Sequence, residues 1–125
     1  MSEKSLSRQA FNILPKVAEV DGLITPERQR HLVEVHPEAS FTALGGGPMR
    51  HSKKTTAGRA ERLGVLRRAF ADVEVHAGTR LKETGPDDIL DAFVVTWSVG
   101  RWLTGTHVQL GGELDRRGLR MEIVA

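Results

Sequence analysis

The sequence predicts a mostly helical α/β domain with two or three strands. Residues 86–103 carry apolar side chains at helical spacing behind a strong helix-start signal. Two short stretches, residues 32–36 and 119–124, alternate apolar and polar side chains as strands do. A length of 125 residues suits one hydrophobic core. We therefore expect one domain over residues 1–125, organised around the 86–103 helix.

This long helix carries acidic residues close to its start. Pro86 suits the first turn, where its missing N–H would be unpaired anyway, and Asp87 and Asp88 complement the positive end of the helix dipole. Asp91 lies beyond the reach of the dipole, in an otherwise apolar run, and shares one helix face with Asp88. A buried carboxylate has to be paired, hydrogen-bonded or bound to metal. A salt bridge to an arginine and a functional role are both open for Asp91.

The other elements follow from shorter signals. Helical spacing predicts a helix over residues 7–20 that Pro15 kinks or divides into two. Glu34 and His36 share one face of the 32–36 strand, and a half-exposed edge strand would leave both in solvent. Residues 71–84 fit either a strand or a short helix followed by a loop, of which we prefer the second. The remaining predictions are a short helix at 37–44, a helix at 57–70 capped by Thr55 or Thr56, and a strand at 119–124 after a polar loop containing Gly111 and Gly112.

The composition argues against a disulfide-bonded, a secreted and a membrane-spanning protein. The chain has no cysteine, which excludes disulfides and thiolate metal sites and fits a reducing compartment. The start of the chain lacks the apolar centre of a signal peptide, and no apolar run reaches the roughly 18 residues of a membrane span. We therefore expect a soluble, cytoplasmic protein without a membrane partner.

Basic residues gather in one segment. The net charge is only +2, yet residues 50–68 hold seven lysines and arginines against one acid, Glu61. Lys53 and Lys54 come just before the predicted 57–70 helix, where free N–H groups and the dipole favour an anion. A solvated basic face is the commoner explanation of such a segment, and contact with phosphates is the alternative.

Six stretches together carry a family resemblance. They read QAFNILPK at 9–16, EVD at 19–21, EVHPEASF at 34–41, HSKKT at 51–55, DDILDA at 87–92 and GLRMEI at 118–123. In this order they resemble the prokaryotic predicted RNase H-like nucleases catalogued as domain of unknown function 429. The resemblance implies a fold similar to RNase H and the Holliday-junction resolvases. It also implies only the C-terminal part of that fold, because residues 1–8 cannot supply the antiparallel strands with which family members begin.

The resemblance further implies a metal-dependent nuclease site with Mg²⁺ or Mn²⁺ as cofactor and nucleic acid as partner. Such enzymes hold their metals between a first-strand carboxylate, a Glu on a later strand and acids on the last core helix. Glu34 matches the later strand, and Asp88 and Asp91 match the helix pair. The first-strand Asp has no counterpart here, and two-metal hydrolysis needs ligands that place both ions around the phosphate. The residues expected to meet the phosphate backbone are Lys53, Lys54, Arg59 and Arg62.

Three hypotheses about function stay open. The first is a metal-dependent nuclease of RNase H-like type that is inactive alone. The second is a non-catalytic nucleic-acid-binding module that keeps the basic 50–68 segment. The third is a fragment that needs a partner chain carrying the missing strands, or a second copy of itself, because an exposed strand edge and an uncovered apolar helix favour association.

Overall fold

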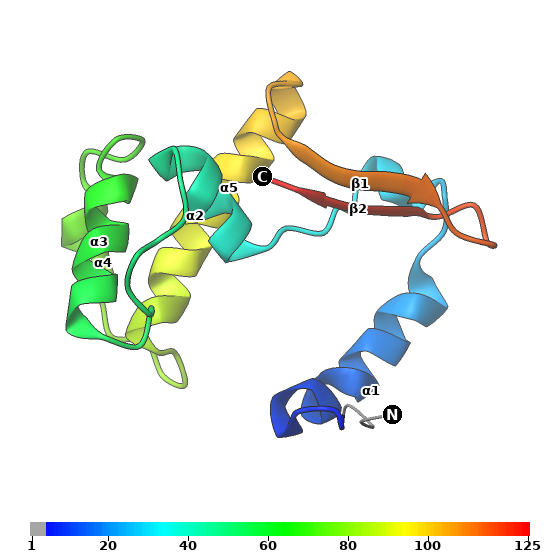
Figure 1. Cartoon of the computed structure of the whole chain (residues 1–125), viewed down its shortest axis with the longest axis horizontal. Coiled ribbons are helices and arrows are strands. Elements are labelled where there is room, and N and C mark those ends of the chain that lie inside the picture. Colours follow the sequence, from blue (N-terminus) through cyan, green and yellow to red (C-terminus); the bar gives the residue numbers. More distant parts are fainter. Residues whose placement is uncertain (1–4) are drawn as a thin grey trace.

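The computed structural model describes residues 5–125, and the expected fold class is confirmed: the described chain is mostly helical with a two-stranded antiparallel sheet (Figure 1). Residues 1–4, part of the segment considered above for a signal peptide, lie outside the described residues. No helix in the described part is long and apolar enough to cross a membrane. In chain order the elements are α1 (Arg8–Leu23), the 3-10 helix η1 (Arg28–Arg30), α2 (Pro37–Gly45), α3 (Thr56–Leu66), α4 (Val73–Ala77), α5 (Pro86–Thr104), β1 (Gln109–Leu114) and β2 (Arg120–Val124).

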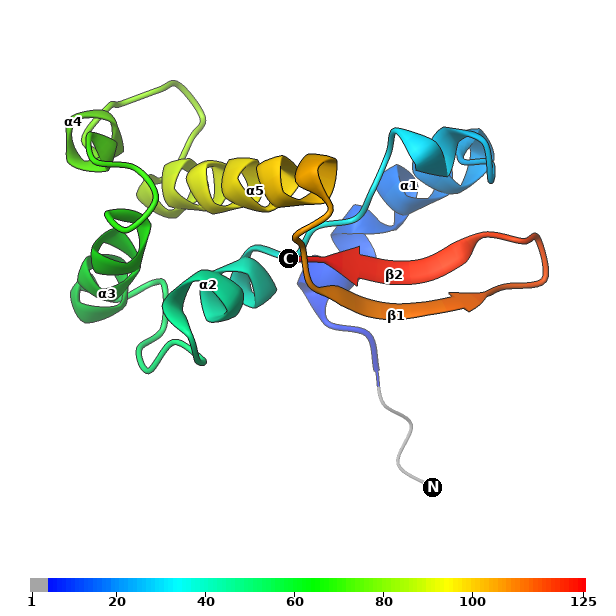
Figure 2. The ribbon, with the colours of Figure 1, turned by 90° about the horizontal axis from the view of Figure 1, so that it is seen from above.

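Helix α5 is the centre of the core, as its sequence predicts. Leu90, Val94 and Ser98 recur at intervals of four residues and form its buried stripe. This stripe packs against α2, α3 and α4, which gather around α5 at one end of the molecule (Figure 2). Among the described residues, three polar side chains are buried with this apolar core: Arg62, Ser40 and Ser98, whose hydroxyl donates to that of Ser40 at 2.7 Å. The short helix α4 also confirms the helix-and-loop interpretation of residues 71–84.

The sheet differs from the prediction at its first strand. We expected a polar loop where β1 lies, because Gly111 and Gly112 are loop residues by composition. Both glycines have positive φ, and the register shifts between Gly111 and Glu113, so the pair forms a β-bulge within the strand. A Cβ at Gly111 would lie 2.3 Å from the carbonyl oxygen of Met121 on β2. The glycines thus permit close pairing of two strands.

The predicted strand at residues 32–36 is wrong. This segment makes a single parallel bridge, Val35 to Val124, with a hydrogen bond of 2.9 Å from the Val124 N–H to the Glu34 carbonyl. Further along β2, a side chain occupies the edge: the Gln29 amide accepts from the Arg120 N–H at 2.8 Å and donates to the Arg120 carbonyl at 3.0 Å. Because Gln29 satisfies these groups, the ladder does not extend beyond one bridge.

Helix α1 is continuous through Pro15 rather than two short helices. Ser7 caps it by accepting a hydrogen bond of 3.1 Å from the Ala10 N–H. None of its residues is buried. Figure 1 shows it apart from the helices around α5, with its C-terminal end toward the turn of the hairpin formed by β1 and β2.

Two glycines of α3 should respond oppositely to alanine. At Gly58 an added Cβ would lie 1.9 Å from the Ser52 carbonyl oxygen, whereas nothing lies within 4 Å of one added at Gly64. We expect Gly58→Ala to lower the free energy of unfolding by about 1–3 kcal/mol, because backbone has to move. Gly64→Ala should raise it by about 0.5–1 kcal/mol through helix propensity. Urea denaturation measures both, and equal effects would contradict the close approach of Ser52 to α3.

Candidate phosphate-binding site

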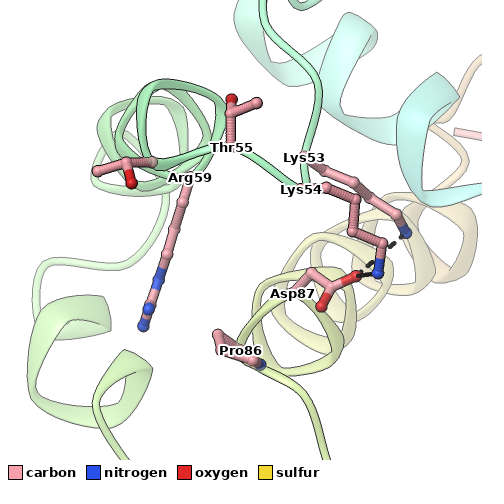
Figure 3. Close-up of a pocket in the computed structure, with 7 residues that line it drawn as sticks. Lys53, Lys54, Thr55, Arg59, Pro86 and Asp87 are labelled. Carbon is pink, nitrogen blue, oxygen red and sulfur yellow. Dashed lines mark hydrogen bonds and ion pairs between the residues drawn. The ribbon is translucent and has the colours of Figure 1, made fainter.

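The turn before α3 positions two lysines. Thr55 caps the helix, since its hydroxyl accepts from the Gly58 N–H at 3.0 Å. The same hydroxyl donates to the Ser52 carbonyl at 2.7 Å, and the Thr55 N–H bonds that carbonyl at 3.0 Å. These bonds hold the turn against α3, so Lys53 and Lys54 both reach across to the first turns of α5 (Figure 3).

The lysines meet two carboxylates on α5. Lys54 Nζ lies 2.6 Å from Asp87 Oδ2, and Lys53 Nζ lies 2.9 Å from Asp91 Oδ2 and 3.8 Å from Asp87 Oδ2. Both aspartate side chains are 18% exposed, whereas the Lys54 side chain is 72% exposed. We call these four residues the lysine–aspartate cluster. It ties the turn before α3 to α5.

Hydrogen bonds shift the pKa values of two members of the cluster, Lys53 and Asp87. The hydrogen bond to Asp91 raises the pKa of Lys53 above its usual range, against the opposing effect of burial. The hydrogen bond from Lys54 lowers the pKa of Asp87. One acceptor is left over: Asp91 Oδ1 is buried and has no hydrogen-bond partner among the described residues. Asp91 is thus only partly satisfied by Lys53.

A cavity of about 330 Å³ opens beside the cluster. It lies between the N-terminal ends of α3 and α5, where both helix dipoles present partial positive charge. The Arg59 guanidinium also lines it, held by a hydrogen bond of 3.0 Å from Nη2 to the Ala77 carbonyl on α4. The site therefore suits an anion. The lining residues are Lys53, Lys54, Thr55, Thr56, Arg59, Pro86 and Asp87 (Figure 3).

Arg62, the fourth predicted phosphate contact, lies elsewhere. It is only 3% exposed, and it grips Glu38 of α2 through two hydrogen bonds, of 2.8 Å and 3.1 Å. Its remaining terminal nitrogen donates to the carbonyls of His51 and Gly58, and its plane lies over the Phe41 ring. Four of the five guanidinium N–H groups have these partners, so Arg62 joins α3 to α2, and it is not among the residues that line the cavity.

The structure does not bring Glu34, Asp88 and Asp91 together. Asp88 folds back to the helix start, where Oδ2 accepts a hydrogen bond of 2.7 Å from the Gly85 N–H. Glu34 is exposed, beside β2. Among residues 5–125 no three acidic or histidine side chains are close enough to hold one metal ion. The residues present therefore do not fit an assembled Mg²⁺ or Mn²⁺ centre.

We predicted that Asp88 lies beside Asp91 in the site, but the structure places Asp87 there. Each residue turns an α-helix by about 100°, so Asp87 and Asp91, four apart, lie close to the buried stripe of α5. Asp88 points to another side. The four-residue spacing is visible in the sequence, but the dipole explanation accounted equally for both acids of the first turn.

Fold and site together define a small, mostly helical α/β chain with a basic cavity at two helix starts. The family model described as "Protein of unknown function (DUF429)" matches residues 1–116. The chain belongs to this family, which confirms the resemblance drawn from the six sequence stretches. No curated protein and no solved structure matches the chain.

Arg62 should matter for folding. Its replacement by methionine leaves Glu38 without its partner and removes the side-chain donor from the carbonyls of His51 and Gly58. We expect Arg62→Met to lower the free energy of unfolding by about 3 kcal/mol. Arg50→Met, at an exposed position of the same basic segment where the guanidinium has no hydrogen-bond or ion-pair partner among the described residues, should change it by less than about 0.5 kcal/mol. Chemical denaturation tests the pair, and similar small effects would argue against a structural role for Arg62.

Proposed function

We propose that this chain binds the phosphate backbone of a nucleic acid at the cavity between α3 and α5. The observation that carries the proposal is the convergence of Lys53, Lys54 and Arg59 on one cavity at two helix starts. These three cations outnumber the carboxylates of Asp87 and Asp91, so the site keeps a net positive charge.

Lys54 is the best placed phosphate ligand. Its ammonium has three donors, and Asp87 accepts from one of them. Most of its side chain is exposed, so it can turn toward a phosphate at little cost. Thr55 and Thr56, at the start of α3, line the same cavity, so the positive end of the helix dipole also favours an anion there. Lys53 is held more firmly by Asp91 and contributes mainly charge.

Binding should depend on these lysines and on salt. Each neutralised phosphate releases counterions, so log K falls with log salt by about 0.7–0.9 for each contact. We expect Lys53→Gln with Lys54→Gln to weaken binding of labelled DNA and RNA oligonucleotides and to reduce this slope by about 1.4–1.8. Fluorescence anisotropy across a salt series measures both quantities.

The matched control removes the same charge elsewhere. Arg30 and Arg116 are exposed, and neither lines the cavity. The Arg30→Gln, Arg116→Gln chain should retain the salt slope of the unmodified chain. Equal slopes for both double variants would leave residues 50–68 as a solvated basic face, and melting curves exclude unfolding as the cause of any loss.

A second candidate function is metal-dependent hydrolysis of RNase H-like type. The observation in its favour is Asp91, whose buried Oδ1 lacks a partner and whose carboxylate lies beside the phosphate cavity. The described residues do not gather three ligands. Further ligands would have to come from outside residues 5–125, so we expect these residues to bind without cutting.

A cleavage assay separates the two functions. With Mg²⁺ or Mn²⁺, on branched, duplex and RNA–DNA hybrid substrates, we expect no hydrolysis above a protein-free blank, because no three ligands are assembled. Asp91→Asn serves as the matched control. Metal-dependent cleavage that disappears in Asp91→Asn would establish the nuclease function and contradict binding alone.

A further inference from the structure

Helix α1 has an apolar face that the described residues leave largely exposed. By their spacing its large apolar side chains, with Ala10 and Ala18, occupy about half of the helix circumference. These side chains are between 43% and 65% exposed. Arg8 and Lys16 flank the apolar arc on its two sides. The large apolar residues of this arc are Phe11, Ile13, Leu14, Val17 and Val20.

The hairpin of β1 and β2 has an uncovered apolar face as well. Leu110 pairs with Ile123, and Glu113 pairs with Met121, so all four side chains stand on one face. Val108 continues this face beside Ala125. Val108, Leu110 and Met121 are between 43% and 54% exposed. An apolar sheet face with one acid, Glu113, thus lies open.

Within one chain these two faces do not cover each other. The end of α1 is fixed to the hairpin turn, because Arg117 Nη1 lies 2.6 Å from Asp21 Oδ1 and Nη2 donates to the Asp21 carbonyl at 3.0 Å. From this attachment α1 and the hairpin diverge (Figure 1). Both faces therefore stay exposed in the monomer.

We propose that a second copy of this chain covers both faces, with α1 of each copy packed on the β1–β2 face of the other. One chain carries both halves of the contact, so a two-fold pair covers them at once. The charges are complementary, since Glu113 stands on the sheet face and Lys16 flanks the helix face. Neither residue has an ion-pair partner among the described residues.

The area is sufficient for a specific dimer. A large aliphatic side chain buries about 60–120 Å² on full burial. Each copy contributes eight large apolar side chains near half exposure, five from α1 and three from the hairpin. The two copies together would therefore bury about 800 Å² of apolar surface. Because homodimer interfaces are about 65% apolar, the total is about 1,200 Å², the lower end of specific interfaces. We therefore expect a reversible dimer.

Cross-linking tests the arrangement, because the chain has no cysteine of its own. Val17→Cys and Met121→Cys chains are prepared separately, mixed and oxidised. The mixture should give a disulfide-linked dimer of one chain of each kind, in larger yield than either variant alone. Val75→Cys on α4, 77% exposed and remote from both faces, is the control and should not cross-link to either.

Analytical ultracentrifugation of the full chain without introduced cysteines measures self-association independently. The chain should dimerise with rising concentration, and Val17→Glu should weaken self-association by at least about tenfold, because it would bury an unpaired carboxylate. Val17 is exposed in the monomer, so circular dichroism should show unchanged helix content.

Three results would overturn the proposal. A monomer at all concentrations would leave the apolar faces for another polypeptide, such as one carrying further strands. Preferential cross-linking of Val17→Cys with itself would show that the helices pair with each other. An intrachain disulfide in a chain carrying both cysteines, at a concentration where it is monomeric, would show that α1 covers its own sheet. None of these results depends on whether Lys53 and Lys54 bind phosphate.

Discussion

The burial of one stripe of α5 governs both the fold and the site. Leu90, Val94 and Ser98 face α2, α3 and α4, and this contact fixes the rotation of the helix about its axis. With the rotation fixed, Asp87 and Asp91 turn toward the neighbouring turn at residues 52–55, and Asp88 turns away to cap the helix. The positions of the charged groups therefore follow from the packing of apolar ones.

The lysines offset the loss of hydration that partial burial imposes on the Asp91 carboxylate. A carboxylate next to the core loses much of its hydration, and it needs a cation nearby. Lys53 supplies that cation at 2.9 Å, and Lys54 supplies a second one to Asp87. The same ammonium groups line the cavity, so a bound phosphate would share them with the aspartates. Lys54, the more exposed of the two, can be shared at lower cost than Lys53.

Local signals predict the helix starts well. Pro86 and the acids behind it mark α5, and Thr55 marks α3, because capping involves only neighbouring residues. Contacts between residues far apart in the chain cannot be predicted from such local signals. Arg62 looks like one member of a basic patch until Glu38, 24 residues earlier, is found against it. The 32–36 segment alternates like a strand, yet its ladder stops where Gln29 takes the edge of β2. The Gly111–Gly112 pair indicates a loop, because the bulge it permits needs the opposite strand.

The two uncovered apolar faces place a limit on how a single chain can be stabilised. A fully buried aliphatic side chain contributes about 1.5–3 kcal/mol, and the side chains of α1 forgo much of this while they face water. A partner that binds only the folded chain adds to its stability by mass action. In the proposed dimer, assembly would be coupled to folding, and the stability of the chain would rise with its concentration. The phosphate cavity stays open throughout, because α3 and the start of α5 lie at the opposite end of the molecule from α1 and the hairpin (Figure 2).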